Sequence, residues 1–186
     1  MRKIAVFFPG TGYHCDKPLL YYARKLAKEI GFEEQICIKY DYDFDAVKDF
    51  EELEGAYPFI FAQIEEQLNY VNWNAYDEIL FVCKSMGTVL SSMYIEKHHA
   101  DHVKQVWFTP VANAFARELH KCDTIAFLGT LDPISDVNEI SKLCKEKAIP
   151  LSLYESCNHS LECESVRKNI KVLDDIMEKT LNFLSL

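Results

Sequence analysis

The amino-acid sequence predicts an α/β fold: a doubly wound, mostly parallel six-stranded sheet with helices on both faces. Its predicted strands are continuous apolar runs, which is typical of strands that are covered on both sides. These runs alternate with segments whose apolar residues recur at helical spacing. The chain has 186 residues, 49% of them hydrophobic, and we expect residues 1–186 to form a single domain with one full core.

The first strand is predicted at residues 3–8, because this apolar run stops at a proline and a glycine that mark a turn. A helix is predicted next. Asp16 suits its N-cap, Pro18 lies in its first turn, and apolar residues then recur at helical spacing up to Gly31.

The later elements are predicted from the same two patterns. Apolar runs indicate the other strands at residues 35–40, 78–82, 105–109, 124–128 and 150–154. Helical spacing indicates the other helices at residues 45–53, 58–71, 86–97, 137–147 and 162–184. The connection from Pro110 to Cys122 has room for one short helix and is too short for a lid domain.

Charge and composition disfavour several classes of partner. The net charge of −9 and the pI of about 5.1 disfavour binding to nucleic acid, whose phosphates an acidic surface repels. No apolar stretch approaches the roughly 20 residues that span a bilayer, and the apolar start is too short for a signal peptide. Seven cysteines at irregular spacing predict reduced thiols, and therefore a cytoplasmic protein.

A candidate nucleophile lies where the third predicted strand meets a helix. The segment reads Cys83-Lys84-Ser85-Met86-Gly87. A tight strand-to-helix turn would expose the Ser85 hydroxyl at the top of the sheet, provided that the flanking residues are small. The start of the following helix would offer unpaired N–H groups to a developing oxyanion.

This segment resembles the Gly-x-Ser-x-Gly nucleophile elbow of the α/β-hydrolase superfamily, with Cys83 in place of the first glycine. The resemblance covers nearly the whole chain. It implies a minimal version of that fold, without the two leading antiparallel strands of larger members and with strand order 2-1-3-4-5-6. It also implies that an acid and then a histidine follow the nucleophile along the chain, each just past the end of a strand.

Two later segments fit that order. Asp132 stands three residues after Gly129 at the end of the fifth predicted strand, and it resembles the acid of the superfamily. Asp136 is a nearby competitor, whereas Asp123 begins the strand and would lie at the opposite edge. His159 follows the sixth strand and resembles the catalytic histidine. In a parallel sheet these strand ends meet at one edge, so we expect the three side chains to form a triad.

Acyl transfer also needs two N–H donors for the oxyanion. The resemblance implies that Met86 supplies one of them. The loop after the first strand would supply the other, from Thr11 or alternatively from Gly12. Gly10, Gly12 and Tyr13 are expected to line the substrate site, because glycines let the backbone approach a ligand closely.

Lys84 precedes the nucleophile, and its side chain is expected beside the mouth of the pocket. There it would favour substrates with an anionic group near the scissile bond. The alternative is a solvated lysine, or one paired with a nearby carboxylate.

The resemblance implies a carboxylesterase-like serine hydrolase that cleaves a small, soluble ester, thioester or amide through an acyl-enzyme on Ser85. It implies no metal and no organic cofactor. Two other classes stay open: a non-catalytic binding module on a hydrolase frame, and a nucleotide-binding domain that uses Gly10-Thr11-Gly12. The nucleotide fingerprint lacks its third glycine, because Cys15 stands there. The residues leave the oligomeric state open.

Overall fold

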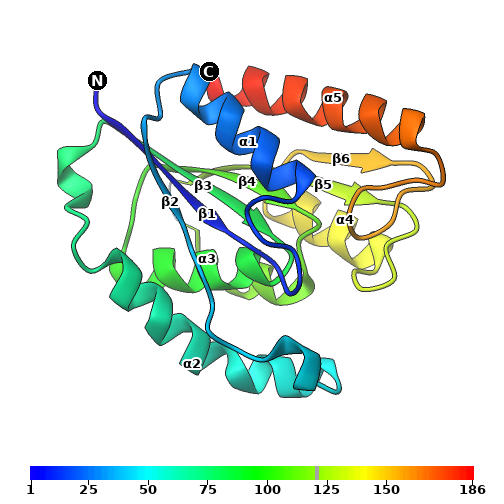
Figure 1. Ribbon diagram of the computed structural model, residues 1–186, viewed down its shortest axis with the longest axis horizontal. Coiled ribbons are helices and arrows are strands. Elements are labelled where there is room, and N and C mark those ends of the chain that lie inside the picture. Colours follow the sequence, from blue (N-terminus) through cyan, green and yellow to red (C-terminus); the bar gives the residue numbers. More distant parts are fainter. Residues whose placement is uncertain (120–121) are drawn as a thin grey trace.

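A computed structural model describes residues 1–119 and 122–186, and its centre is one six-stranded sheet (Figure 1). All neighbouring strands pair in parallel, in the order β2-β1-β3-β4-β5-β6, which confirms the predicted fold class and strand order. The strands are β1 (Lys3–Phe8), β2 (Glu34–Cys37), β3 (Glu78–Lys84), β4 (Val103–Phe108), β5 (Asp123–Gly129) and β6 (Leu151–Tyr154).

Helices cover both faces of the sheet, as Figure 1 shows. The longer helices are α1 (Pro18–Glu29), α2 (Phe50–Leu68), α3 (Met86–His98), α4 (Val137–Glu146) and α5 (Val166–Leu184). Helices α1 and α5 pack on one face, and α2, α3 and α4 pack on the other. Three short 3₁₀ helices lie in connections: η1 (Phe44–Ala46), η2 (Trp73–Ala75) and η3 (Ala112–Ala116).

The core consists of two apolar layers, one on each side of the sheet. Along β1, Ala5 and Phe7 point toward α1 and α5, while Val6 and Phe8 point toward α2 and α3. All four side chains are fully buried, which is why the strand reads as an uninterrupted apolar run. Within the described part of the chain, no helix is both long and apolar enough to cross a bilayer.

Residues 45–53 and 58–71 were expected to form two helices, but α2 runs through Pro58 without a break. The helix begins at the N-cap Asp49, whose side chain accepts a hydrogen bond from the Glu52 N–H at 2.9 Å. Pro58 is exposed, whereas Tyr57 and Ile60 on either side of it are buried. The continuous buried face holds the helix together although proline removes one of its hydrogen bonds.

The starts of two other helices differ from the prediction. Lys17, not Asp16, precedes the first residue of α1, and Asp16 instead accepts a hydrogen bond from Arg24 at 3.0 Å. The last helix begins at Val166 rather than at residue 162, because Ser165 caps it through the Lys168 N–H.

The expectation of seven reduced thiols is wrong for one pair. Cys157 and Cys163 form a disulfide, because the loop between β6 and α5 turns back on itself and brings their Cα atoms to 4.4 Å. The other five cysteines are free. The pair removes part of the reason for expecting a cytoplasmic protein, so that location stays a prediction.

Candidate active site

Ser85 lies in a strained turn between β3 and α3. Its backbone has φ 53° and ψ −120°, in the left-handed half of conformational space that residues other than glycine rarely adopt. Hydrogen bonds hold the turn in place. The Ser85 N–H donates to the Phe108 carbonyl at 3.0 Å, and the Thr88 N–H and hydroxyl donate to the Ser85 carbonyl at 2.8 and 2.7 Å. This geometry is typical of a nucleophile elbow.

Gly87 lets the first turn of α3 touch the loop after β1. A Cβ atom at this position would lie 2.2 Å from the Phe8 carbonyl oxygen, so no other residue fits without moving the backbone. Cys83, which stands where the elbow often has its other glycine, is fully buried on the α3 side of the sheet. Its Cβ and sulfur are therefore accommodated in the core.

The side chains of Ser85, His159 and Asp132 form one chain of hydrogen bonds. His159 Nε2 lies 2.8 Å from Ser85 Oγ, and His159 Nδ1 lies 2.7 Å from Asp132 Oδ2. The other carboxylate oxygen, Asp132 Oδ1, accepts the N–H groups of Ile134 at 2.8 Å and Ser135 at 3.0 Å. Those two amides hold the carboxylate toward the imidazole, and they could not be assigned from sequence spacing.

The loops that carry the acid and the histidine are bonded to each other. The Leu131 N–H donates to the Cys157 carbonyl at 2.9 Å, and the Ser156 N–H donates to the Thr130 hydroxyl at 2.8 Å. Asp136, the competing acid, instead caps α4 through the Glu139 N–H at 2.8 Å.

The loop after β1 offers amides beside the nucleophile. Gly10 and Tyr13 exchange backbone hydrogen bonds of 3.2 and 3.1 Å, which uses their N–H groups and leaves the amides of Thr11 and Gly12 outside that pairing. Met86 is the first residue of α3, so its N–H has no partner within the helix. The arrangement is compatible with either loop residue as the second oxyanion donor.

Several solved structures share this architecture. A protein of unknown function from Agrobacterium tumefaciens, a candidate α/β hydrolase, matches with a TM-score of 0.68 and 12% identity over 99% of this chain and 84% of that one. An α/β serine hydrolase homologue from Coxiella burnetii matches with a TM-score of 0.67 and 11% identity over 96% and 84%. A Bacillus cereus carboxylesterase matches with a TM-score of 0.57 and 15% identity over 95% and 88%. No family model and no curated protein matches the sequence.

The chain has the α/β-hydrolase fold. At this low identity the matches establish the fold alone, so the roles of its residues rest on the geometry of this chain. In the α/β-hydrolase fold the carboxyl ends of β3, β5 and β6 meet at one edge, and Ser85, Asp132 and His159 follow those three ends.

The electrostatics of this edge favour a neutral imidazole beside a charged carboxylate. Burial lowers the pKa of His159, and the positive charge of Lys84 lowers it further. The hydrogen bond and charge of Asp132 raise this pKa, but the net pKa lies below its ordinary value. Burial raises the pKa of Asp132, but the hydrogen bond and charge of His159, together with two backbone amides, outweigh burial and hold the pKa below its ordinary value.

The sequence predicts Lys84 beside the mouth of the pocket, and this prediction is wrong. Its side chain is on the α1 and α5 side of the sheet with 1% of its surface exposed, and its ammonium lies 5.1 Å from the centre of the Tyr13 ring. Lys84 is the last residue of β3, and successive side chains of a strand point to opposite faces of the sheet. Because Cys83 points toward α3, Lys84 points toward α1 and α5. Burial lowers the pKa of Lys84 from 10.5 to about 7, and the charge of Asp132 offsets part of that effect.

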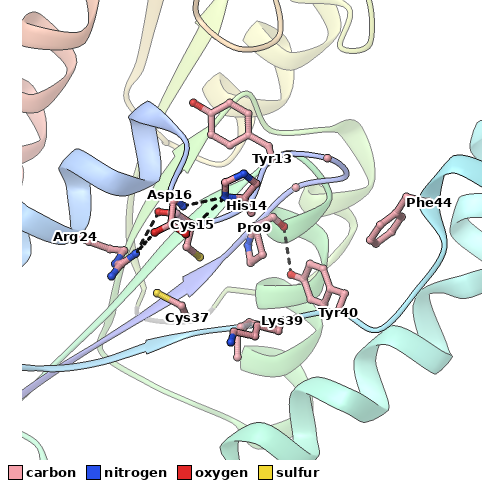
Figure 2. A pocket seen from close by; sticks show the side chains of 13 residues that line it. Pro9, Tyr13, His14, Cys15, Asp16, Arg24, Cys37, Lys39, Tyr40 and Phe44 are labelled. Carbon is pink, nitrogen blue, oxygen red and sulfur yellow. Dashed lines mark hydrogen bonds and ion pairs between the residues drawn. The ribbon is translucent and has the colours of Figure 1, made fainter.

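A pocket of about 670 Å³ adjoins the loop after β1 (Figure 2). Gly10, Gly12 and Tyr13, the three loop residues expected at the substrate site, all line it. The far wall comes from the chain just after β2, where the Tyr40 hydroxyl donates to the Pro9 carbonyl at 3.2 Å. Ser85 itself is not among the residues that line the pocket, but Gly10, which does line it, directly neighbours Ser85.

Within the described part of the chain, no three His, Cys, Asp or Glu side chains come together in a way that could hold a metal ion. His98, at the end of α3, stacks on Tyr94 and lies 3.2 Å from a Glu65 carboxylate oxygen.

Proposed function

We propose that this protein is a serine hydrolase of the carboxylesterase type, with Ser85 as nucleophile, His159 as general base and Asp132 as the acid that orients the imidazole. The observation that carries the proposal is the unbroken series of hydrogen bonds through these three side chains, at 2.8 and 2.7 Å. It stands at a strained elbow in front of a helix N-terminus, where a reacting serine is activated and its oxyanion is stabilised.

The reaction follows from these positions. With Nδ1–H donating to Asp132, the other ring nitrogen, Nε2, accepts the proton of the Ser85 hydroxyl as its oxygen attacks a carbonyl carbon. The N–H groups of Met86 and of Thr11 or Gly12 receive the oxyanion. His159 then protonates the leaving group, and an acyl-enzyme remains on Ser85. Water activated by the same imidazole releases the acid and restores the serine.

The substrate is proposed to be a small, soluble ester, thioester or amide. The connection from β4 to β5 carries η3, a helical segment of five residues, where a lid would otherwise cover the site. The described pocket of about 670 Å³ suits a molecule with a short acyl chain.

Hydrolysis of 4-nitrophenyl esters from acetate to decanoate tests the proposal. We expect the specificity constant to peak among the short chains. Ser85→Ala and His159→Ala should each lower kcat by about 10⁴-fold or more, because the triad acts as a unit. Ser160→Ala, which removes the hydroxyl next to His159 in the chain, should keep wild-type activity. Residual activity above a few per cent in Ser85→Ala would exclude Ser85 as the nucleophile.

A further inference from the structure

The pocket beside the loop after β1 holds charged side chains that the proposed reaction does not use (Figure 2). Arg24 comes from α1 and Lys39 from the chain just after β2, and His14 also lines the pocket. Among the described lining residues, Asp16 is the one carboxylate. With His14 neutral, the lining carries one net positive charge on a protein whose net charge is −9, and this local excess favours an anionic ligand.

The Arg24 guanidinium has hydrogen-bond donors that the described part of the protein does not use. Its Nη1 donates to the Asp16 carboxylate at 3.0 Å and to the Cys15 carbonyl at 3.4 Å. Its Nε is buried and has no hydrogen-bond partner among the described residues. A buried donor without a partner is costly, so a ligand oxygen that reached this guanidinium would be bound with a gain in stability.

The backbone of Lys39 is held by hydrogen bonds, whereas its ammonium group has no ion-pair partner among the described residues. Its backbone N–H donates to the Gln67 side chain at 2.9 Å, and its carbonyl accepts from the same side chain at 2.8 Å. No ion pair engages its ammonium in the part of the chain that the structure describes. The backbone is therefore fixed, while the ammonium is available to a ligand.

Gly10 lies between this pocket and Ser85. It lines the pocket, and a Cβ atom on it would lie 3.1 Å from Ser85 Cβ, so one glycine separates the pocket from the nucleophile. Ile38, Tyr40 and Phe44 give the pocket an apolar wall. A substrate with its carbonyl at Ser85 could lay a short carbon chain along this wall and place a charged end near Arg24.

We propose that the pocket binds a carboxylate carried by the substrate, so that the preferred substrates are anionic esters whose short carbon chain ends in a carboxylate. Arg24 and Lys39 hold the charged group, and the apolar wall holds the chain. The proposal rests on the function proposed above, because it assigns the substrate of the same site.

The test compares two esters of equal chain length, 4-nitrophenyl hydrogen adipate and 4-nitrophenyl hexanoate. Wild-type protein should prefer the adipate ester. Arg24→Gln should lower that preference about tenfold, and Lys39→Gln, on an exposed side chain, several-fold. Lys25→Gln removes the exposed charge next to Arg24 in the chain and should leave the preference unchanged, while Arg24→Lys should retain part of it. An equal preference in wild type, Arg24→Gln and Lys39→Gln would overturn the proposal.

Calorimetric binding of adipate and hexanoate to Ser85→Ala protein separates the pocket from the reaction. Adipate should bind more tightly than hexanoate, and the added change Lys39→Gln or Arg24→Gln should weaken adipate binding alone. Equal binding of the two acids would contradict the carboxylate site. Charge-selective binding without hydrolysis of any ester would support the pocket and refute the proposed hydrolase, whereas hydrolysis without charge preference would refute only the pocket.

Discussion

At the scale of single residues, the buried and half-buried ionisable side chains of Lys84, Asp132 and His159 set the protonation state of the proposed catalytic base. Lys84 is a fully buried lysine one residue before Ser85, with a pKa lowered to about 7, and in its charged form it lowers the pKa of His159. Only neutral imidazole accepts the serine proton, so a lower pKa keeps the base in its active form in more acidic solution. Nothing in the sequence distinguishes this lysine from a solvated one, because the direction of its side chain depends on the register of β3 in the sheet.

The pH profile tests this electrostatic role. The specificity constant of the wild type should rise with pH and reach half its maximum below pH 6.5, because the pKa of His159 is lowered from that value. Lys84→Met removes a positive charge that disfavours the imidazolium, so the midpoint should move to higher pH, while Lys142→Met, on an exposed lysine of α4, should leave it in place. An unmoved midpoint in Lys84→Met would show that the charge of Lys84 does not act on His159.

At the scale of elements, the sequence predicted where strands and helices lie better than where they begin and end. Strands were found because β1 and its neighbours are covered on both faces. The sequence predicts separate helices at residues 45–53 and 58–71, whereas α2 is one helix with Pro58 inside it, held together by the buried face on both sides of the proline. The packing of α3 on the β1 loop, which requires Gly87, was likewise visible only in three dimensions.

Gly87→Ala tests that packing. The added methyl group would meet a backbone oxygen at 2.2 Å, so the elbow or the β1 loop must shift. We expect a loss of about 3 kcal/mol in the free energy of unfolding, measured by urea denaturation, together with a large loss of activity. Gly55→Ala, in the exposed interior of α2 with nothing within 4 Å, should instead stabilise by about 0.5–1 kcal/mol. Equal effects of the two substitutions would contradict the close contact.

Pro58→Ala should stabilise the protein. Alanine restores the helical hydrogen bond to the Glu54 carbonyl, and this gain exceeds the added entropy of the unfolded chain, for a net effect of about 1–2 kcal/mol. Pro18→Ala is the control, because Pro18 occupies the first turn of α1, where no helical bond is missing. Thermal unfolding measures both, and a Pro58→Ala protein no more stable than Pro18→Ala would mean that the helix does not form this bond.

At the scale of the whole molecule, the prediction of the fold depended on regularities that many residues share. Apolar runs that alternate with helical segments predicted a parallel sheet, and its carboxyl edge then placed three separate loops together. The features that escaped prediction depend on the folded arrangement of single residues: the Cys157–Cys163 disulfide, the burial of Lys84, and the place of both Arg24 and Lys39 in the lining of one pocket. Such contacts follow from the folded backbone and have no spacing pattern in the chain.

The central claim is that Ser85 is a nucleophile activated by His159, and covalent labelling tests it most directly. Protein treated with a fluorophosphonate and digested should carry one phosphonate, located by mass spectrometry on the peptide that contains Ser85. Labelling should be lost in Ser85→Ala, strongly slowed in His159→Ala, and unchanged in Ser160→Ala. Absence of labelling in folded wild-type protein, or equal labelling of wild type and Ser85→Ala, would contradict the account and favour a binding module on a hydrolase frame.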